Sequence, residues 1–299
     1  HLLIGQENQI SIYCGNGWYK GRLGYEGASQ CYGTRFAAIV ELHIWYEDGS
    51  ETVVATDETW TYRGSDIEMS DLYDGEVLNR QLWKEKENTA KPVRLIEKDQ
   101  GTLMGEISLT SSQLTERYSL PVKVKETLTV QEIIHTQAGE IVLDMGQNMV
   151  GFVEFDSNLP AGTKVILDSG KCCSKAISIM ITIERQRPDM SIFRTAEGKR
   201  YASFHLLWLP LCACDWMAGE VEPSVFRGCV VYSDLETTTY FDSSSAQLNR
   251  LAKNCMWGQK SNFLDMPTDC PQRDERLGWT GDAQVFAPTA CYNMDTRAF

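Results

Sequence analysis

The stretch "MPTDCPQRDERLGWTGDAQVFAP", residues 266–288, gathers many charged side chains between prolines and glycines. Its carboxylates are Asp269, Asp274, Glu275 and Asp282. Crowded carboxylates raise the free energy unless a proton, a cation or a substrate hydroxyl relieves their repulsion. Only Arg273 and Arg276 stand among them as cations. A carboxylate pair, further acids that accept hydroxyls and a flat aromatic side chain, here Trp279, are what a glycosidase subsite requires. A solvated, salt-bridged loop is the alternative that the residues leave open.

The segments on either side of this stretch have helical periodicity. In "DSSSAQLNRLAKNCMWGQKSNFL", residues 242–264, Ser244 and Gln247 form a capping box, which predicts a helix over 244–263 that Pro267 ends. Its apolar face is predicted to comprise Leu248, Leu251, Ala252, Cys255, Met256, Gln259 and Phe263. A second helix is predicted over 280–294, with Thr280 as its N-cap.

Upstream of residue 242 the chain is typical of β structure. In "FAAIVELHIWYEDGSETVVATDETWTY", residues 36–62, apolar and polar residues alternate on both sides of Asp48-Gly49, which predicts a hairpin with its tip there. Further short strands and turns in "GEIVLDMGQNMVGFVEFDSNLPAGTKVILDSG", residues 139–170, predict a second β unit. The expected architecture is therefore mainly β: two β-sandwich domains followed by helices.

The composition of the chain excludes some classes of binding partner. The 299 residues carry a net charge of −13, which speaks against nucleic acid as a partner, and they fit an acidic enzyme acting on neutral small molecules or sugars. No apolar run reaches the length of a bilayer span, so no membrane partner is expected. The chain opens without an initiator Met or a visible signal peptide, which leaves a cytoplasmic and a periplasmic or secreted location both open.

The ten cysteines do not indicate a metal or redox site. Two pairs lie close together, Cys172 with Cys173 and Cys212 with Cys214, but no C-x-x-C motif occurs and the chain has only four His. Buried free thiols are the expected state, and no metal or other cofactor is predicted.

The segment "FLDMPTDCPQRDERLGWTGDAQVFAPTA", residues 263–290, resembles the signature of bacterial α-L-rhamnosidases of glycoside hydrolase family 78. The strings "GNGWYKG", "YEDGSETVVATDETW" and "DLYDGEVLNR" resemble the N-terminal β-sandwich of that family, and "VLDMGQNMVGFVEF" with "PAGTKVIL" resembles its concanavalin-like domain. The resemblance implies an N-terminal β-sandwich over 1–125, a concanavalin-like β domain over 126–236 and, over 237–299, the first helices of a truncated (α/α)6 six-hairpin barrel.

The resemblance also implies roles for particular residues. Glu275 aligns with the general acid of an inverting mechanism, and the family's general base lies later in the barrel, beyond residue 299. Four further residues align with the lining of the rhamnose subsite: Asp269, Arg273, Trp279 and Asp282. A general acid that works near neutral pH needs a raised pKa, which Asp269 and Asp282 would favour and a touching Arg273 would oppose. Asp274 is expected to support the site or cap a helix, and Trp279 to pack on the 6-deoxy methyl group.

Three functions follow from this reading. The first is hydrolysis of terminal α-L-rhamnose from a rhamnose-containing glycan or glycoside, with residues 1–299 themselves inactive for want of the base. The second is a non-catalytic carbohydrate-binding β-sandwich fragment. The third is a related (α/α)6 glycosidase that acts on another sugar. The oligomeric state and the aglycone are left open.

Residues 171–187 and 204–216 depart from the family pattern. One set of codons spells "GEVLQQGNFYNDNYREAK", text typical of the family, and spells "GKCCSKAISIMITIERQ" after the loss of one base. The string "FHLLWLPLCACDW" likewise becomes "FTFYGFRYVRVTG" when it is read one base later. The hypothesis is that both windows are frameshifted, with real divergence as the alternative, and that both pack poorly.

Overall fold

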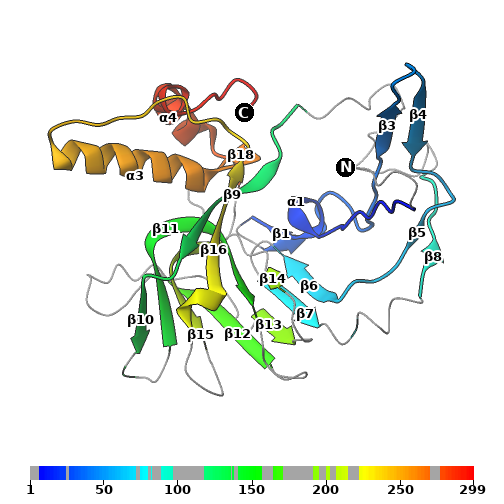
Figure 1. Ribbon diagram of the computed structural model, residues 1–299, viewed down its shortest axis with the longest axis horizontal. Coiled ribbons are helices and arrows are strands. Elements are labelled where there is room, and N and C mark those ends of the chain that lie inside the picture. The colour runs from blue at the N-terminus through cyan, green and yellow to red at the C-terminus, as the bar shows by residue number, and fades with distance from the viewer. Residues whose placement is uncertain are drawn as a thin grey trace.

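The protein is mainly β, with two long helices near the C-terminus (Figure 1), which confirms the predicted fold class. The computed structural model describes residues 7–24, 27–71, 75–79, 82, 89–96, 118–135, 137, 141–156, 164–170, 191–194, 200–202, 207–214, 222–269 and 277–299. Within these ranges, no helix is both long enough and apolar enough to cross a bilayer.

A ten-stranded sheet forms the centre of the molecule. Its main path runs β6-β7-β13-β12-β15-β11-β16-β9, and β10 and β14 also pair with β11. The strands are β6 (Ile67–Asp71), β7 (Gly75–Asn79), β9 (Val122–Thr129), β10 (Glu132–His135), β11 (Ile141–Asp156), β12 (Lys164–Gly170), β13 (Ser191–Arg194), β14 (Arg200–Ala202), β15 (Leu207–Cys214) and β16 (Phe226–Ser233).

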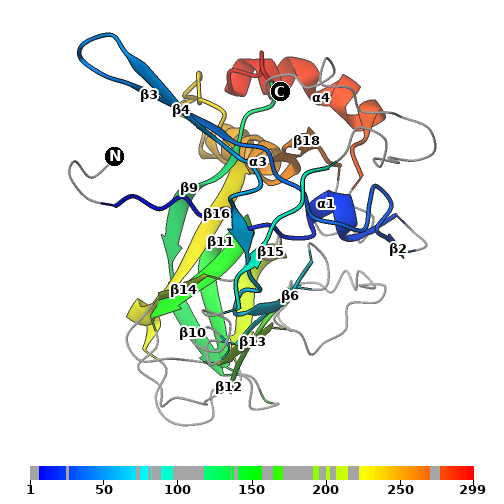
Figure 2. The same cartoon turned by 90° about the vertical axis from the view of Figure 1, so that its right-hand side faces the viewer.

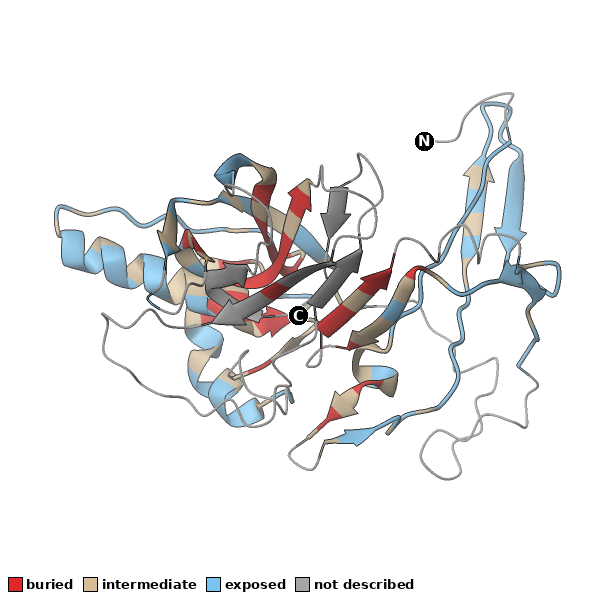
Figure 3. Ribbon diagram, turned by 90° about the horizontal axis from the view of Figure 1, so that it is seen from below, coloured by how far each residue is buried: buried red, intermediate tan, exposed pale blue. Residues whose placement is uncertain are grey.

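Strand β11 is the strand on which the core is built. It is 16 residues long, and it pairs antiparallel with β15 and with β16. When apolar residues occupy both the odd and the even positions of a strand, both of its faces can be covered by other parts of the protein. Its side chains accordingly enter two apolar clusters, and Figure 3 shows the buried residues gathered at this part of the sheet. Leu143, Met149 and Phe155 belong to one cluster, whereas Val150 and Phe152 belong to the other.

The sheet includes strands from the region predicted as the first β domain. Strand β7 runs parallel to β13, with Leu78 opposite Phe193. The two predicted β units therefore share backbone hydrogen bonds. Their predicted boundary at 125/126 lies in the sequence between β7 and β13 and stays a prediction.

A hairpin formed by β3 (Glu41–Trp45) and β4 (Glu51–Ala55) projects from the rest of the molecule (Figures 1 and 2). Its tip is at Asp48-Gly49, as predicted. Gly49 has φ +83°, a left-handed conformation that glycine adopts without cost, and the Asp48 carboxylate accepts from the Ser50 amide at 2.9 Å.

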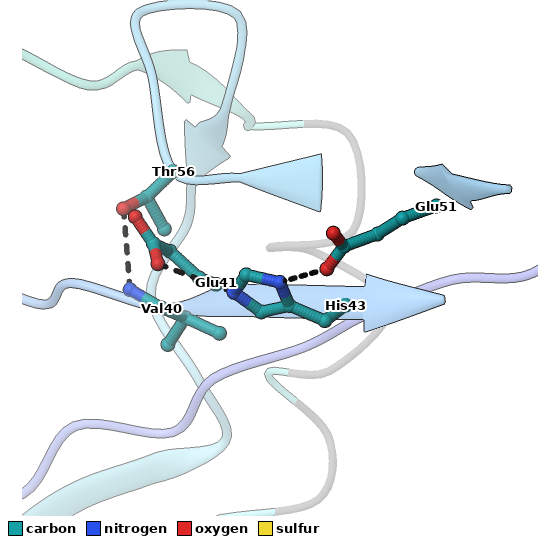
Figure 4. A network of polar contacts seen from close by, with 5 residues as sticks. All are labelled: Val40, Glu41, His43, Glu51 and Thr56. Atoms are coloured by element: carbon teal, nitrogen blue, oxygen red, sulfur yellow. Dashed lines mark hydrogen bonds and ion pairs between the residues drawn. The ribbon is translucent and has the colours of Figure 1, made fainter. Parts of the chain in front are cut away.

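One face of the hairpin carries a polar cluster around His43 (Figure 4). Its Nδ1 lies 2.6 Å from Glu51 of the partner strand, its Nε2 lies 3.4 Å from Glu41, and its ring stacks on Trp45. These two carboxylates raise the pKa of the His43 imidazole, with Glu51 contributing more than Glu41. The opposite face is apolar and carries Leu42, Ile44 and Val54.

The remaining N-terminal elements are short. They are helix α1 (Gly17–Lys20) and strands β1 (Arg22–Leu23), β2 (Ala28–Ser29), β5 (Thr61–Tyr62) and β8 (Lys91–Pro92), and a 3-10 turn, η2 (Pro223–Val225), precedes β16.

Both predicted helices form, but their caps differ from the prediction. Helix α3 (Ala246–Asn262) is capped by Ser245, whose hydroxyl accepts from the Leu248 amide at 3.4 Å, so the predicted Ser244–Gln247 capping box is wrong by one residue. The reason is a turn just before the helix: the Ser243 hydroxyl accepts from the Ser245 amide, so that Ser245 and not Ser244 stands at the N-cap position. The helix ends at Asn262, well before Pro267.

Helix α4 (Thr280–Asn293) begins at the residue predicted to cap it. Trp279 occupies the N-cap position and supplies no side-chain acceptor there. Pro288 lies inside the helix, and it is tolerated there. Ala290 of α4 is buried and Val285 of α4 is exposed, whereas Leu248 and Leu251, which were predicted on the apolar face of α3, are exposed.

The five cysteines for which the structure gives burial are free thiols. Cys229 is buried, and its burial raises the pKa of the thiol to about 11. Cys14 and Cys291 are exposed, so the expectation of buried thiols is wrong for them.

The two proposed frameshift windows differ in how much of them is described. Residues 171–187 lie outside the described residues. In the second window, residues 207–214 form β15, whose backbone pairs with β11 and with β12. Regular backbone pairing is therefore present there, and the prediction of poor side-chain packing stays a prediction.

Candidate active-site loop

The carboxylate stretch, residues 269–282, begins beside a very tight turn. Strand β17 (Phe263–Leu264) pairs with β18 (Met266–Pro267), with Leu264 opposite Met266, so that Asp265 alone makes the turn. Asp265 has φ +66°. Such a left-handed conformation is uncommon for a residue with a side chain, although Asp tolerates it better than most.

The two ends of the stretch are held together by backbone contacts. Thr268 forms an antiparallel bridge with Gly278, and the Trp279 amide donates to the Pro267 carbonyl at 3.0 Å. The Thr268 amide in turn donates to the Asn262 carbonyl, the last residue of α3, at 2.9 Å. The chain just before residue 270 and the chain just after residue 276 are therefore held together beside the C-terminal end of α3.

Two predicted site residues lie next to this backbone bridge, one on each side of it. Asp269 follows the bridge directly and is half-buried, with its Oδ1 shielded from solvent. Trp279 lies on the other side of the bridge and is half-buried. Its Nε1 is also shielded and finds no hydrogen-bond acceptor within the described ranges. A shielded donor of this kind is costly unless a ligand or a neighbouring oxygen accepts from it.

Asp282 occupies a different environment. It lies in the first turn of α4 and is exposed. A carboxylate there interacts favourably with the positive end of the helix dipole, and the Trp279 cap provides no acceptor of its own. Asp282 can therefore stabilise α4 whether or not it also contacts a sugar. The other predicted site residues, Glu275 and Arg273, lie outside the described residues, as does Asp274.

A buried amide joins the two helices that flank the loop. Gln259 of α3 is 1% exposed, donates to the Ala290 carbonyl of α4 at 3.2 Å and accepts from Asn293 Nδ2 at 2.9 Å. The ring of Phe263 stacks on that of Phe299 at 4.3 Å, close to this joint. The helices are thus fixed to each other by polar and apolar contacts at the level of the loop base.

Charged side chains fix α3 to the sheet beneath it. Lys260 of α3 lies 2.5 Å from Glu126 of β9, and Glu126 also accepts from the buried Tyr232 hydroxyl at 2.9 Å. Burial, and then the Glu126 carboxylate, raise the pKa of the Tyr232 phenol.

A second ionic group lies at the end of β16. Hydrogen bonds from the Lys123 and Lys125 ammonium groups hold the pKa of the Asp234 carboxyl at about 2.

Several residues of this base were not predicted as site residues. Thr268 and Asn262 close the loop, and the Ser233 hydroxyl accepts from the Asp265 amide at 2.8 Å. In the sequence, Thr268 and Asn262 could be indicated by their proximity to Pro267. Ser233 has no such signal, because its contact with Asp265 joins residues that are far apart in the sequence.

Three family models match successive parts of the chain. The α-L-rhamnosidase N-terminal domain matches residues 1–126, the bacterial α-L-rhamnosidase concanavalin-like domain matches 134–204, and the bacterial α-L-rhamnosidase six-hairpin glycosidase domain matches 236–299.

Curated relatives are similar over the whole length of the chain. An α-L-rhamnosidase of Streptomyces avermitilis is 31% identical over 305 residues, which cover 98% of this chain and 28% of that protein. An α-L-rhamnosidase of Formosa agariphila is 30% identical over 311 residues, which cover 100% of this chain and 32% of that protein. The chain therefore spans less than a third of the length of either relative.

Solved structures agree with these relatives. The crystal structure of the Streptomyces avermitilis α-L-rhamnosidase complexed with L-rhamnose superposes with a TM-score of 0.78 at 28% identity, over 95% of this chain and 27% of that one. The native α-L-rhamnosidase from Aspergillus terreus gives a TM-score of 0.78 at 27% identity, over 94% of this chain and 33% of that one. Models of three α-L-rhamnosidase domains match successive parts of the chain, and a solved α-L-rhamnosidase superposes over most of it, so the chain belongs to the bacterial α-L-rhamnosidases of glycoside hydrolase family 78.

Proposed function

We propose that the chain contributes the general acid and part of the sugar subsite to an enzyme that hydrolyses terminal α-L-rhamnose with inversion. The observation that carries the proposal is the backbone bridge between Thr268 and Gly278, which joins the chain next to Asp269 to the chain next to Trp279 in a segment that matches the six-hairpin glycosidase domain. The names of the relatives support rhamnose as the sugar that is released.

In the proposed mechanism Glu275 donates a proton to the glycosidic oxygen as the bond to the anomeric carbon breaks. A water molecule attacks that carbon from the opposite face, and a second carboxylate, roughly 6.5–9.5 Å from the first, removes its proton. This second carboxylate, the general base, is proposed to come from a part of the barrel beyond residue 299. The match of the six-hairpin model to residues 236–299 and the small share of each relative that the chain covers support this division.

The subsite residues have distinct proposed roles. Asp269 and Arg273 bind sugar hydroxyls, which are polar groups that a carboxylate and a guanidinium recognise by hydrogen bonds. Trp279 packs its ring on the 6-deoxy methyl group, an apolar surface that distinguishes rhamnose from sugars that carry a hydroxyl group at C6. Asp282 lies near enough in sequence to contact the same sugar, in addition to its position at the N-terminus of α4.

Hydrolysis of an aryl α-L-rhamnoside tests this proposal. Residues 1–299 alone are expected to show no turnover above background, since loss of a general base removes about 10²–10⁴-fold of the rate and loss of the pocket removes substrate positioning. A chain extended through the complete barrel is expected to be active. In that chain Glu275→Gln, which keeps the shape of the side chain and cannot donate the proton, is expected to abolish turnover.

The alternatives predict other outcomes of the same assay. A panel of aryl glycosides separates rhamnose from other sugars, and faster hydrolysis of another sugar would replace the substrate while keeping the role of Glu275. Saturable rhamnose binding by the extended chain without turnover would instead indicate a carbohydrate-binding module. Robust hydrolysis by residues 1–299 alone would overturn the proposed division of acid and base.

A further inference from the structure

The turn at Asp265 depends on the β domain beneath it. Asp265 is the single residue between the paired Leu264 and Met266, and its left-handed conformation, φ +66°, directs the chain back on itself. Its amide donates to the hydroxyl of Ser233 at 2.8 Å. Ser233 is the last residue of β16, and its backbone pairs with Val122 of β9.

Ser233 is a fixed acceptor. The residue is 0% exposed, so neither solvent nor a rotation of its side chain into solvent can replace the bond that it accepts. Its backbone is held in the ladder between β16 and β9. An acceptor that is buried and held in this way sets the position of the amide bound to it.

The residues just before the turn point into two separate apolar clusters. Leu264 is 2% exposed and packs with Val150, Phe152 and Val231 of the sheet. Phe263 belongs to the other cluster, where it meets the rings of Phe286 and Phe299. Since consecutive side chains are anchored on opposite sides, the backbone of the turn has little freedom to rotate or slide.

From this turn an unbroken series of backbone contacts leads to both ends of the carboxylate stretch. Asp265 is followed by β18, which pairs with β17. After β18, Thr268 bridges to Gly278, and the Pro267 carbonyl accepts from the Trp279 amide. A displacement at Asp265 is therefore transmitted to Asp269 on one side and to Trp279 on the other.

From this geometry we infer that Ser233 and Asp265 are positioning residues for the carboxylate stretch, acting through the backbone of β18 and without contact to the sugar. Ser233 fixes the height of the loop base above the sheet, and Asp265 supplies the backbone conformation that starts the loop. The inference rests on the proposed function only for the role of Asp269 and Trp279 in sugar binding. If Ser233 and Asp265 act in this way, the β domain helps to position the site residues and does not merely lie next to the barrel.

Amide hydrogen exchange of the 299-residue protein tests the role of Ser233. In Ser233→Ala, the amides of 264–268 and of Trp279 are expected to exchange faster by about tenfold or more, because the buried acceptor is lost. The indole N–H signal of Trp279 in the ¹H–¹⁵N spectrum is expected to shift as well. Ser224→Ala, which removes an exposed hydroxyl just before β16, is the matched control and is expected to change neither readout.

A pair of substitutions tests Asp265 independently. Asp265→Ala and Asp265→Gly remove almost the same side-chain atoms, but only glycine adopts φ +66° without strain. The Ala variant is expected to show the faster exchange and the shifted Trp279 signal. The Gly variant is expected to keep both at their wild-type values, so that it acts as the rescue.

The outcomes discriminate between explanations. A fall in global stability with unchanged exchange at the loop base and an unchanged Trp279 signal would overturn the inference, since a merely structural hydroxyl would act in that way. Equal effects of Ala and Gly at position 265 would overturn the backbone role of Asp265. If Ser233→Ala does not fold, the pair at position 265 decides. Neither measurement uses a sugar, so failure of the proposed activity would leave them unaffected, and their failure would leave the activity assay intact.

Discussion

Gly151 of β11 is paired with Val230 of β16, and there is no room for a side chain at this position. A Cβ built on it would stand 1.8 Å from the carbonyl oxygen of Cys229, which is backbone and cannot move aside alone. Gly258, in the interior of α3, is the opposite case, because a Cβ there would meet nothing within 4 Å. Glycine is therefore required by the lack of space at position 151, whereas no such steric requirement exists at position 258.

The comparison of these two glycines gives a prediction. Gly151→Ala is expected to lower the free energy of unfolding by about 3 kcal/mol or more, since two paired strands must separate. Gly258→Ala is expected to raise it by roughly 0.5–1 kcal/mol, because alanine favours the helix. Urea unfolding of the three proteins measures both changes. A Gly151→Ala protein as stable as the wild type would contradict the close approach of β11 and β16.

The ionisation of His43 gives a second prediction. Its pKa is raised from the usual 6.5 by Glu51 and Glu41. Because the folded pKa is the higher one, the contribution of this cluster to stability is fully present below about pH 6.5 and is lost as the pH rises through the folded pKa. An NMR titration of the His43 ring is expected to give a midpoint above 6.5 that falls in Glu51→Gln.

The control for this titration is Glu47→Gln, which removes a carboxylate from the same hairpin without touching the ring. It is expected to leave the midpoint nearly unchanged. An equal fall in both variants would mean that general charge, and not the hydrogen bond to Glu51, raises the pKa.

At the level of elements, the joint between α3 and α4 depends on the side-chain amide of Gln259. Replacement by leucine would leave the side-chain amide of Asn293 without its acceptor and would remove one of the two hydrogen bonds that the Ala290 carbonyl accepts, the other coming from the Met294 amide. We expect Gln259→Leu to lower the free energy of unfolding by about 1–3 kcal/mol. Gln247→Leu, on the exposed part of the same helix, is expected to change it by less than about 0.5 kcal/mol. Similar urea midpoints for the two variants would show that the joint does not depend on this amide.

The elements that could be predicted from the sequence are those with local signals. The hairpin at Asp48-Gly49 and both helices follow from residues within a few positions of one another. The N-cap of α3 is Ser245 and not the predicted Ser244, because three consecutive serines offer the same capping side chain and the sequence does not distinguish between them. Pairing of β7 with β13 could not be predicted, since a parallel pair between distant segments leaves no pattern in either strand.

The candidate site was partly predictable for the same reason. The family resemblance implied Glu275, Asp269, Arg273, Trp279 and Asp282 as site residues, and in the structure Asp269 and Trp279 each follow one of the two residues of the bridge between Thr268 and Gly278. The contact between Ser233 and Asp265 joins a strand end to a turn, and it depends on a single hydroxyl. Neither a serine at position 233 nor an aspartate at position 265 indicates such a contact from the sequence.

At the level of the whole molecule, the central sheet includes residues from the second frameshift window. If the hypothesis is correct, β15 forms from a frameshifted amino-acid sequence. Cys212 and Cys214 then occupy positions where the original reading frame encodes other residues. We expect resequencing of the gene to reveal a one-base change at the start of each window, 171–187 and 204–216. Homogeneous reads that confirm the present frame in both windows would end the hypothesis and leave real divergence.

The parallel pairing of β7 with β13 has a consequence for synthesis on the ribosome. Strand β7 leaves the ribosome about 110 residues before β13, which at roughly 5–20 residues per second is a delay of about 6–22 s. During this time β6 can pair with one edge of β7, while the other edge waits with its hydrogen bonds unmade. The nascent N-terminal half therefore emerges with an open strand edge, and a chaperone that covers such edges would raise the yield of folded protein most at high expression rates.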